Sequence, residues 1–193
     1  AVQEVLPEIE ASLPAGCKLE MVTDRSIFIE SSVNDTLSNI ILGIILTGLV
    51  LFFFLHDLRS TIIVALAMPM SILSAFLFMQ LSGFTLNTMT LMGLSTAVGV
   101  LVTNAVVVLE NIFRHKSMGH NRKEAAAKGT AEVVVAVVAS AMTNIAVFLP
   151  VALMSSMVGQ MFQEFALTVT YATIFSLLIS FTLTPMLASL ILP

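Results

Sequence analysis

The chain contains no tryptophan, a single cysteine and few charged residues. Cys17 alone cannot form a disulfide within the chain. The chain also lacks a phosphate-binding glycine loop and a zinc-spaced cysteine and histidine set, so we expect no ATPase chemistry, metal or cofactor. The net charge of −4 and a basic cluster without interleaved aromatic residues exclude a nucleic-acid partner. What remains is apolar: 58% of the 193 residues are hydrophobic and only 10% are charged.

Long runs without any charge separate the charged residues. These runs are Thr36–His56, Ser60–Leu109, Val133–Gln163 and Phe165–Pro193. About 20 apolar residues cross a hydrocarbon core that is roughly 30 Å thick, so each run is long enough for a membrane span. The second run is long enough for two spans, and the polar and flexible pair Ser82–Gly83 is its natural break. The sequence therefore predicts five spans.

Backbone pairing decides the secondary structure of these spans. An isolated strand in lipid leaves its polar groups unpaired, and the alternating pattern of a membrane barrel is absent, so the spans are predicted to be helices. We therefore expect an all-α polytopic membrane protein whose transmembrane domain covers residues 35–193. Pro69, Pro150 and Pro185 fall inside spans and are expected to produce packing kinks. The five expected spans are 35–56, 60–81, 86–112, 132–154 and 165–191.

Basic residues gather between the third and fourth predicted spans. Cytoplasmic loops are enriched in Lys and Arg, so we expect the loop 113–131 to be cytoplasmic, together with the turn His56–Arg59. Counting through the spans places residues 1–34, Ser82–Gly83 and the loop Ser155–Glu164 on the opposite side. Membrane lipid is an expected partner, since anionic headgroups attract such a loop. Five of the eight Lys and Arg residues lie in it: Arg114, Lys116, Arg122, Lys123 and Lys128.

Residues 1–34 have a different pattern from the rest of the chain. Gln3–Leu13 is predicted to form a short amphipathic helix and Cys17–Val22 a short strand, while Asp24 is a candidate cap for a helix that begins near Arg25. One helix and one strand cannot make a domain alone. Because the chain starts with Ala and shows no signal peptide, we interpret it as a fragment of a larger protein.

Two polar pairs stand near the centres of predicted spans. Thr103 and Asn104 lie in the third span, and Thr143 and Asn144 lie in the fourth, with Ser140 one turn before Asn144. Polar groups at this depth usually face protein, so the two asparagines are expected to bond to each other or to line one polar core. The alternative is that each amide pairs separately with a backbone carbonyl. The hydroxyls of the last span are expected to bond mainly to their own backbone.

Several sequence segments resemble the resistance-nodulation-division (RND) efflux transporters, and among them the hydrophobe and amphiphile exporters. The resemblance covers nearly the whole chain, and its order and spacing are specific. The segments are LPAGCKLEMVTDRS, FLHDLRSTIIVALAMPMSIL, LNTMTLMGLSTAVGVLVTNAVVVLENI, VFLPVALM and FTLTPMLASLILP.

This resemblance implies an inner-membrane protein with two repeated six-span halves, each with a large periplasmic domain after its first span. The chain then corresponds to the C-terminal tail of the first periplasmic porter domain, with a short α/β segment at residues 1–34, and to spans two to six. Members of the family are secondary active transporters, not enzymes. The resemblance implies proton antiport of hydrophobic or amphiphilic compounds by a homotrimer that works with a periplasmic adaptor, an outer-membrane channel and the remaining half of the same transporter.

The chain departs from the family pattern in its third span, where the family has two adjacent Asp residues and this sequence has Thr103 and Asn104. An Asp in a dry helix bundle can gain and lose a proton, whereas Thr and Asn cannot. Three interpretations are open. The pair can make an ordinary polar contact with a neighbouring helix, whose close approach Gly99 would allow. Alternatively, proton coupling uses carboxylates elsewhere in the transporter, or the coupling ion is a different one, such as Na⁺. Thr103 is also expected to bond a carbonyl one turn back.

The sequence therefore predicts a portion of an RND multidrug efflux pump with an altered proton-relay position at Thr103 and Asn104. Alternatives are a non-transporting scaffold or partner subunit, and a heavy-metal exporter of the same superfamily. Glu110 and Arg114, at the cytoplasmic end of the third span, have the spacing for an ion pair within one helix.

Overall fold

The computed structural model describes residues 5–6, 9, 11, 13–14, 25–55 and 57–192. Within these residues the chain is helical and contains no strand. Five helical segments are long and apolar enough to cross a membrane, which confirms the predicted number of spans. The helices are α2 Arg25–Leu55, α3 Leu58–Leu81, α4 Thr88–Ser117, α5 Arg122–Ala152, α6 Met157–Phe181 and α7 Leu183–Ile191.

The N-terminal expectation is confirmed only in part. Helix α2 begins at Arg25, as the sequence predicts, and runs without interruption into the first predicted span. Within the predicted helix Gln3–Leu13, the described residues Val5, Leu6, Ile9 and Ala11 are helical. The predicted strand Cys17–Val22 lies outside the described residues, so the strand part of the expected α/β segment has no support.

Polar caps fix where four of the helices begin. The side chain of Asp57 accepts from the backbone N–H groups of Arg59 and Ser60 at the start of α3. Asn87 caps α4 in a reciprocal capping box with Thr90. Asn121 accepts from the N–H of Glu124 at the start of α5, and Ser156 accepts from the N–H of Gly159 at the start of α6. These caps pair N–H groups that have no partner in the first helical turn, so the turns between spans are set by local sequence.

Two turns depend on glycine. Gly83 has φ +74° between α3 and α4, and Gly119 has φ +94° between α4 and α5. Only glycine adopts these angles without strain, so both reversals are tight. The break predicted at Ser82–Gly83 is therefore confirmed, because α3 ends at Leu81 and the chain turns back at once.

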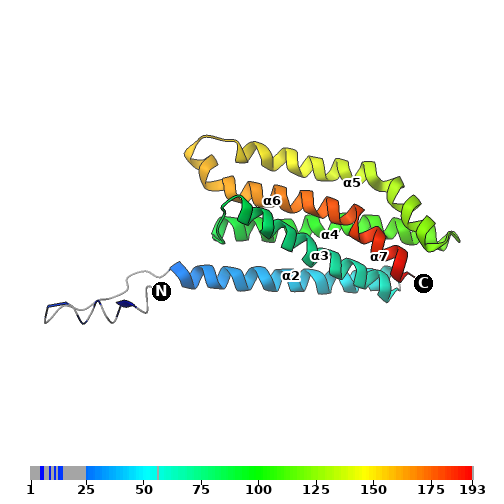
Figure 1. Ribbon diagram of the computed structural model, residues 1–193, viewed down its shortest axis with the longest axis horizontal. Coiled ribbons are helices and arrows are strands. Elements are labelled where there is room, and N and C mark those ends of the chain that lie inside the picture. Colours follow the sequence, from blue (N-terminus) through cyan, green and yellow to red (C-terminus); the bar gives the residue numbers. More distant parts are fainter. Residues whose placement is uncertain are drawn as a thin grey trace.

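Helix α4 is the centre of the bundle and contacts each of the other five helices. Figure 1 shows α2 and α5 on opposite outer sides, with α3, α4 and α6 between them. The core is built from aliphatic and small residues of α3 and α4, such as Ile63, Met68, Leu94, Leu101 and Val108, all of which are buried. The middle of α4 is thus shielded on the side that faces its neighbouring helices.

The last predicted span consists of two helices. Helix α6 ends at Phe181 and α7 starts at Leu183, with Thr182 between them. Pro185 lies in the first turn of α7, and because it has no N–H it cannot donate to the carbonyl of Phe181. The irregularity expected at Pro185 is therefore real, and it appears as a break three residues earlier. Pro69 and Pro150 lie inside the continuous helices α3 and α5.

The ends of the helices gather at two ends of the bundle. One end holds the α2–α3 turn, the α4–α5 turn and the C-terminus of α7, and we call it the basic end (Figure 1). Arg59 Nη1 donates to the carbonyl of Ile191 at 3.2 Å there, which joins the start of α3 to the end of α7. The opposite end holds the α3–α4 and α5–α6 turns.

Candidate functional site

Asn104 lies in the middle of α4 and faces α6. Only 3% of its surface is exposed. Its Nδ2 donates to Ser176 Oγ at 3.3 Å, and Ser176 Oγ in turn donates to the carbonyl of Leu101 at 3.3 Å. The amide and the hydroxyl therefore form one small, uncharged and buried contact between α4 and α6.

The side chain of Thr103 lies toward α2, whereas that of Asn104 faces α6. Its Oγ1 donates to the carbonyl of Gly99 at 3.0 Å, so the predicted bond one turn back is confirmed. The side chain is exposed and lines a mainly apolar groove of about 340 Å³ between α2 and α4, together with Thr47 and Val106. Adjacent helix residues point about 100° apart. Within this chain the two residues therefore belong to different helix interfaces.

The second polar pair does not join the first by a hydrogen bond. Thr143 Oγ1 donates to the carbonyl of Ala139 at 2.8 Å, and Thr143 and Ser140 are exposed. Asn144 is half-buried on α5. Asn104 bonds Ser176 and not Asn144. A polar core shared by the two asparagines therefore stays a prediction, and in this chain the direct partner of Asn104 comes from α6.

The glycine that brings a helix close to α4 is Gly93, not Gly99. A side chain added at Gly99 would meet nothing within 4 Å in the described chain. At Gly93, by contrast, an added Cβ would lie 2.9 Å from the carbonyl oxygen of Phe165 and 3.0 Å from the Cβ of Thr168. The sequence-based expectation for Gly99 is wrong for the helices described. Small residues do allow close helix packing in this bundle, but the close contact is at Gly93, which lies nearer the start of α4 than Gly99.

The hydroxyl groups on α6 and α7 differ in whether they have a hydrogen-bond partner. Thr170 and Thr173 bond to their own backbone carbonyls four residues earlier, as expected. The side-chain oxygens of Thr168, Ser180 and Thr184 are buried without a hydrogen-bond partner in the described chain. Ser176 bonds across to α4 instead, since its Oγ accepts from Asn104 and donates to the carbonyl of Leu101.

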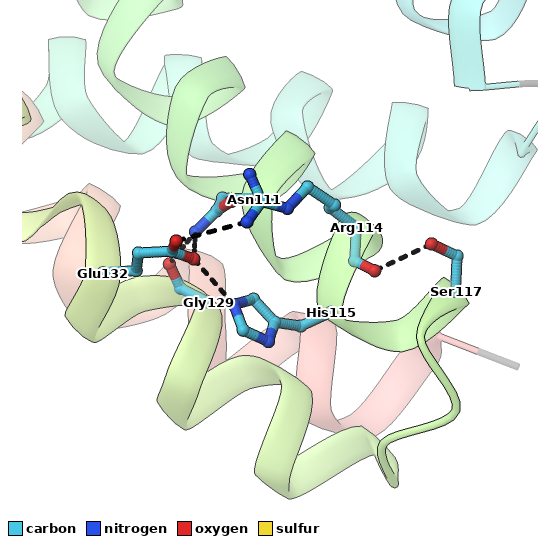
Figure 2. A network of polar contacts seen from close by, with 6 residues as sticks. All are labelled: Asn111, Arg114, His115, Ser117, Gly129 and Glu132. Carbon is cyan, nitrogen blue, oxygen red and sulfur yellow. Dashed lines mark hydrogen bonds and ion pairs between the residues drawn. The ribbon is translucent and has the colours of Figure 1, made fainter.

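A second polar cluster joins α4 to α5 at the basic end (Figure 2). Glu132 Oε2 accepts from Asn111 Nδ2 at 2.9 Å and lies 2.7 Å from His115 Nε2, while Oε1 accepts from Arg114 Nη2 at 3.2 Å. Asn111 Nδ2 also donates to the carbonyl of Gly129 at 2.8 Å. One carboxylate of α5 therefore binds three side chains of α4.

The same cluster corrects one sequence-based expectation. Arg114 pairs with Glu132 of α5, not with Glu110 of its own helix. The reason is the closeness of the two helices: a Cβ added at Gly129 would lie 2.6 Å from the Cα of Ile112. Helix backbones that touch in this way bring Glu132 within reach of α4, and the inter-helix pair replaces the local one.

The opposite end has its own inter-helix bonds. Asn87, the cap of α4, donates from Nδ2 to Glu164 Oε2 of α6. Ser82 Oγ and Tyr171 Oη are 3.0 Å apart and join the end of α3 to α6. Glu164 therefore sits close to the N-terminus of α4, where the helix dipole favours a negative charge. Both ends of α4 are tied to neighbouring helices by a carboxylate, whereas in its middle Asn104 makes an uncharged contact with α6.

Together, the apolar spans and their buried, uncharged polar centre define a multi-pass helical membrane protein. Comparison with known families narrows this class: the sequence profile of the AcrB/AcrD/AcrF family matches residues 1–193, and the chain belongs to this family, which is the RND type predicted above.

Curated relatives agree with this assignment. The chain is 43% identical over 191 residues to the "Multidrug resistance protein MdtC" of Pectobacterium atrosepticum, covering 99% of the chain and 19% of that protein. It is 42% identical over 187 residues to the protein of the same name from Escherichia coli, covering 97% of the chain and 18% of the relative. The chain therefore spans about a fifth of the length of these relatives.

Proposed function

We propose that the chain is the part of an RND-type multidrug efflux transporter that holds five membrane spans of one half. The observation that carries this proposal is the identity of more than 40% to multidrug resistance proteins along almost the whole chain. We further propose that the complete protein lies in the bacterial inner membrane and expels hydrophobic or amphiphilic compounds. Its expected partners are the remaining half, two further copies in a homotrimer, a periplasmic adaptor and an outer-membrane channel.

We also propose that this half cannot bind and release a proton at its relay position. Support comes from Asn104, which is buried in the middle of α4 and is bonded to the neutral Ser176. No charged residue lies between Ser60 and Leu109 or between Val133 and Gln163. An amide resembles a protonated carboxyl group in shape, so Asn104 holds this site in one state at every pH. Any proton coupling by the complete transporter must then use acids outside this half.

A second candidate function follows from the same neutral contact. A protein that no longer couples to protons can persist as a membrane scaffold or as the inactive partner of an active transporter. The two candidates differ in what the complete protein does alone, because only a transporter changes the drug content of cells.

Drug susceptibility separates the two candidates. The complete gene would be expressed in bacteria whose own efflux pumps have been deleted, with empty vector as the control. We expect increased resistance to amphiphilic dyes and detergents, accompanied by lower dye accumulation. If susceptibility stays at the level of the vector control although the protein is present in the membrane, the transporter proposal fails and the scaffold gains support.

We propose that the basic end of the bundle faces the cytoplasm. Support comes from the five basic residues around the α4–α5 turn, since such residues stay on the cytoplasmic side. The test uses single cysteines at Met118 and Ser155, each in a background with Cys17 replaced by Ser. A thiol reagent that does not cross membranes should label only the cysteine at position 155 in intact cells with a permeable outer membrane. Labelling at position 118 instead would invert the orientation.

A further inference from the structure

A groove at the basic end runs between α5 and the α6–α7 break. It has a volume of about 620 Å³. Lys123 and Ala131 of α5 line one wall, and Phe181 and Pro185 line the other. The groove lies away from the Asn104 contact, on the side of the last span that meets α5, and nothing described so far uses it.

The groove changes from charged to apolar along α5. Lys123 stands at one end and Val134 at the other, about 16 Å apart at the helical rise of 1.5 Å per residue. The charged part of α5 ends at Glu132, and the apolar part begins at Val133. The groove therefore crosses the level at which the sequence passes from membrane interface to hydrocarbon.

The cation that lines the groove is Lys123. It makes no ion pair or hydrogen bond within the residues that the structure describes, whereas the nearby acids are both occupied: Glu124 lies 2.7 Å from Lys128, and Glu132 binds Arg114 and His115. An ammonium group on a flexible stem reaches readily along an apolar wall toward a membrane surface. Its charge complements an anionic group bound at this end of the groove.

Farther from Lys123, the walls of the groove also contain polar atoms that lack their usual hydrogen-bond partner. Thr130 lines the groove, and its Oγ1 is buried without a hydrogen-bond partner. Since Pro185 has no N–H, the carbonyl of Phe181 lacks its usual helical donor. Unpaired polar groups in an apolar setting are costly, so a ligand that bonds them gains affinity. Ala126, Ala127 and Ala131 are small and leave room for a chain beside them.

From this arrangement we propose that the groove binds an anionic phospholipid of the leaflet at the basic end. The headgroup phosphate pairs with Lys123, the glycerol region meets the level of Thr130, and one acyl chain lies against Val134, Phe181 and Pro185. A membrane-surface Lys attracts an anionic headgroup, and the groove adds apolar contact along the acyl chain. This inference goes beyond transport and holds whether the complete protein is a pump or a scaffold.

The test uses the complete transporter in nanodiscs of phosphatidylethanolamine with a minor fraction of phosphatidylglycerol that carries a photoreactive acyl chain. Cross-linked peptides are then mapped by mass spectrometry. We expect phosphatidylglycerol to label the peptides that contain Val134 and Phe181. Lys123→Gln removes the charge and Ala131→Trp fills the groove, so each should reduce this labelling several-fold.

Two matched variants control for the general effects of charge and bulk. Lys116→Gln removes another cation that has no ion pair in the described chain, and Ala139→Trp adds the same bulk at an exposed position of α5 outside the groove. Both should label like the parent, and all variants should elute as the parent does on size exclusion. Equal loss in Lys116→Gln, or labelling of the parent by photoreactive phosphatidylcholine as strong as by phosphatidylglycerol, would overturn the proposal. So would a photoreactive residue at position 131 that cross-links to another protein segment and not to lipid.

Discussion

Gly129→Ala is expected to destabilise the protein although it adds only a single carbon atom, because Gly129 is buried in α5 against α4. The added Cβ would lie 2.6 Å from the Cα and 2.8 Å from the amide nitrogen of Ile112, and neither backbone atom can move aside alone. Helices α4 and α5 must separate, which also lengthens the bonds of Glu132 to α4. Overpacking of this kind costs about 1–3 kcal/mol, more than the gain of about 1 kcal/mol that Ala brings to a helix.

Gly99→Ala is the matched control, because it brings the same helix preference at a position with nothing within 4 Å in the described chain. Thermal unfolding of the purified complete protein in detergent, followed by the loss of its size-exclusion peak, gives the comparison. We expect a lower midpoint for Gly129→Ala and an unchanged or higher one for Gly99→Ala. A midpoint for Gly129→Ala at or above that of the parent would show that the α4–α5 contact is not as close as described.

Asn104→Asp is expected to make drug export sensitive to pH in a way that the parent is not. Asp has nearly the shape of Asn, so it fits the same place between α4 and α6, and Ser176 Oγ, now 3.3 Å from the amide nitrogen, can donate to a carboxylate oxygen. The substitution adds a titratable group at the level where the parent has none. Drug accumulation in cells held at two external pH values measures the effect.

The comparison needs a variant that alters the site without adding a proton acceptor. Ser176→Ala removes the partner of Asn104 while both positions stay neutral, and its expected cost is below about 2 kcal/mol, as for other polar bonds between membrane helices. We expect Ser176→Ala to keep the pH profile of the parent. If it gains the same pH dependence as Asn104→Asp, the effect comes from looser packing and not from titration.

The architecture was largely predictable because membrane spans follow from composition alone. Charge-free runs gave the five spans, and Ser82–Gly83 gave the break in the longest run. The helix ends were less accurate: the start of α2 at Arg25 was predicted, but α4 continues to Ser117, beyond the predicted span 86–112. Apolar length measures the hydrocarbon core, whereas the helices extend past it until a cap or a glycine ends them.

The polar contacts were only partly predictable because a single helix does not reveal its neighbour. The bond from Thr103 to Gly99 is local and was expected. The partner of Asn104 was not, because the hydroxyls of the last span were expected to bond mainly to their own backbone. Likewise, nothing in the sequence pointed to Glu132 as the partner of Arg114, since that pairing depends on how closely α5 approaches α4.

The neutral Asn104 contact leads to one decisive measurement: drug-coupled proton movement in proteoliposomes that contain the complete transporter as their sole protein. A proton gradient is imposed, drug is added, and the collapse of the gradient is followed with an internal pH dye for the parent and Asn104→Asp. If the α4 site cannot titrate in the parent, Asn104→Asp should change the drug-dependent collapse several-fold, whatever coupling the rest of the transporter supplies. Strong, drug-dependent collapse by the parent that Asn104→Asp leaves unchanged would contradict it.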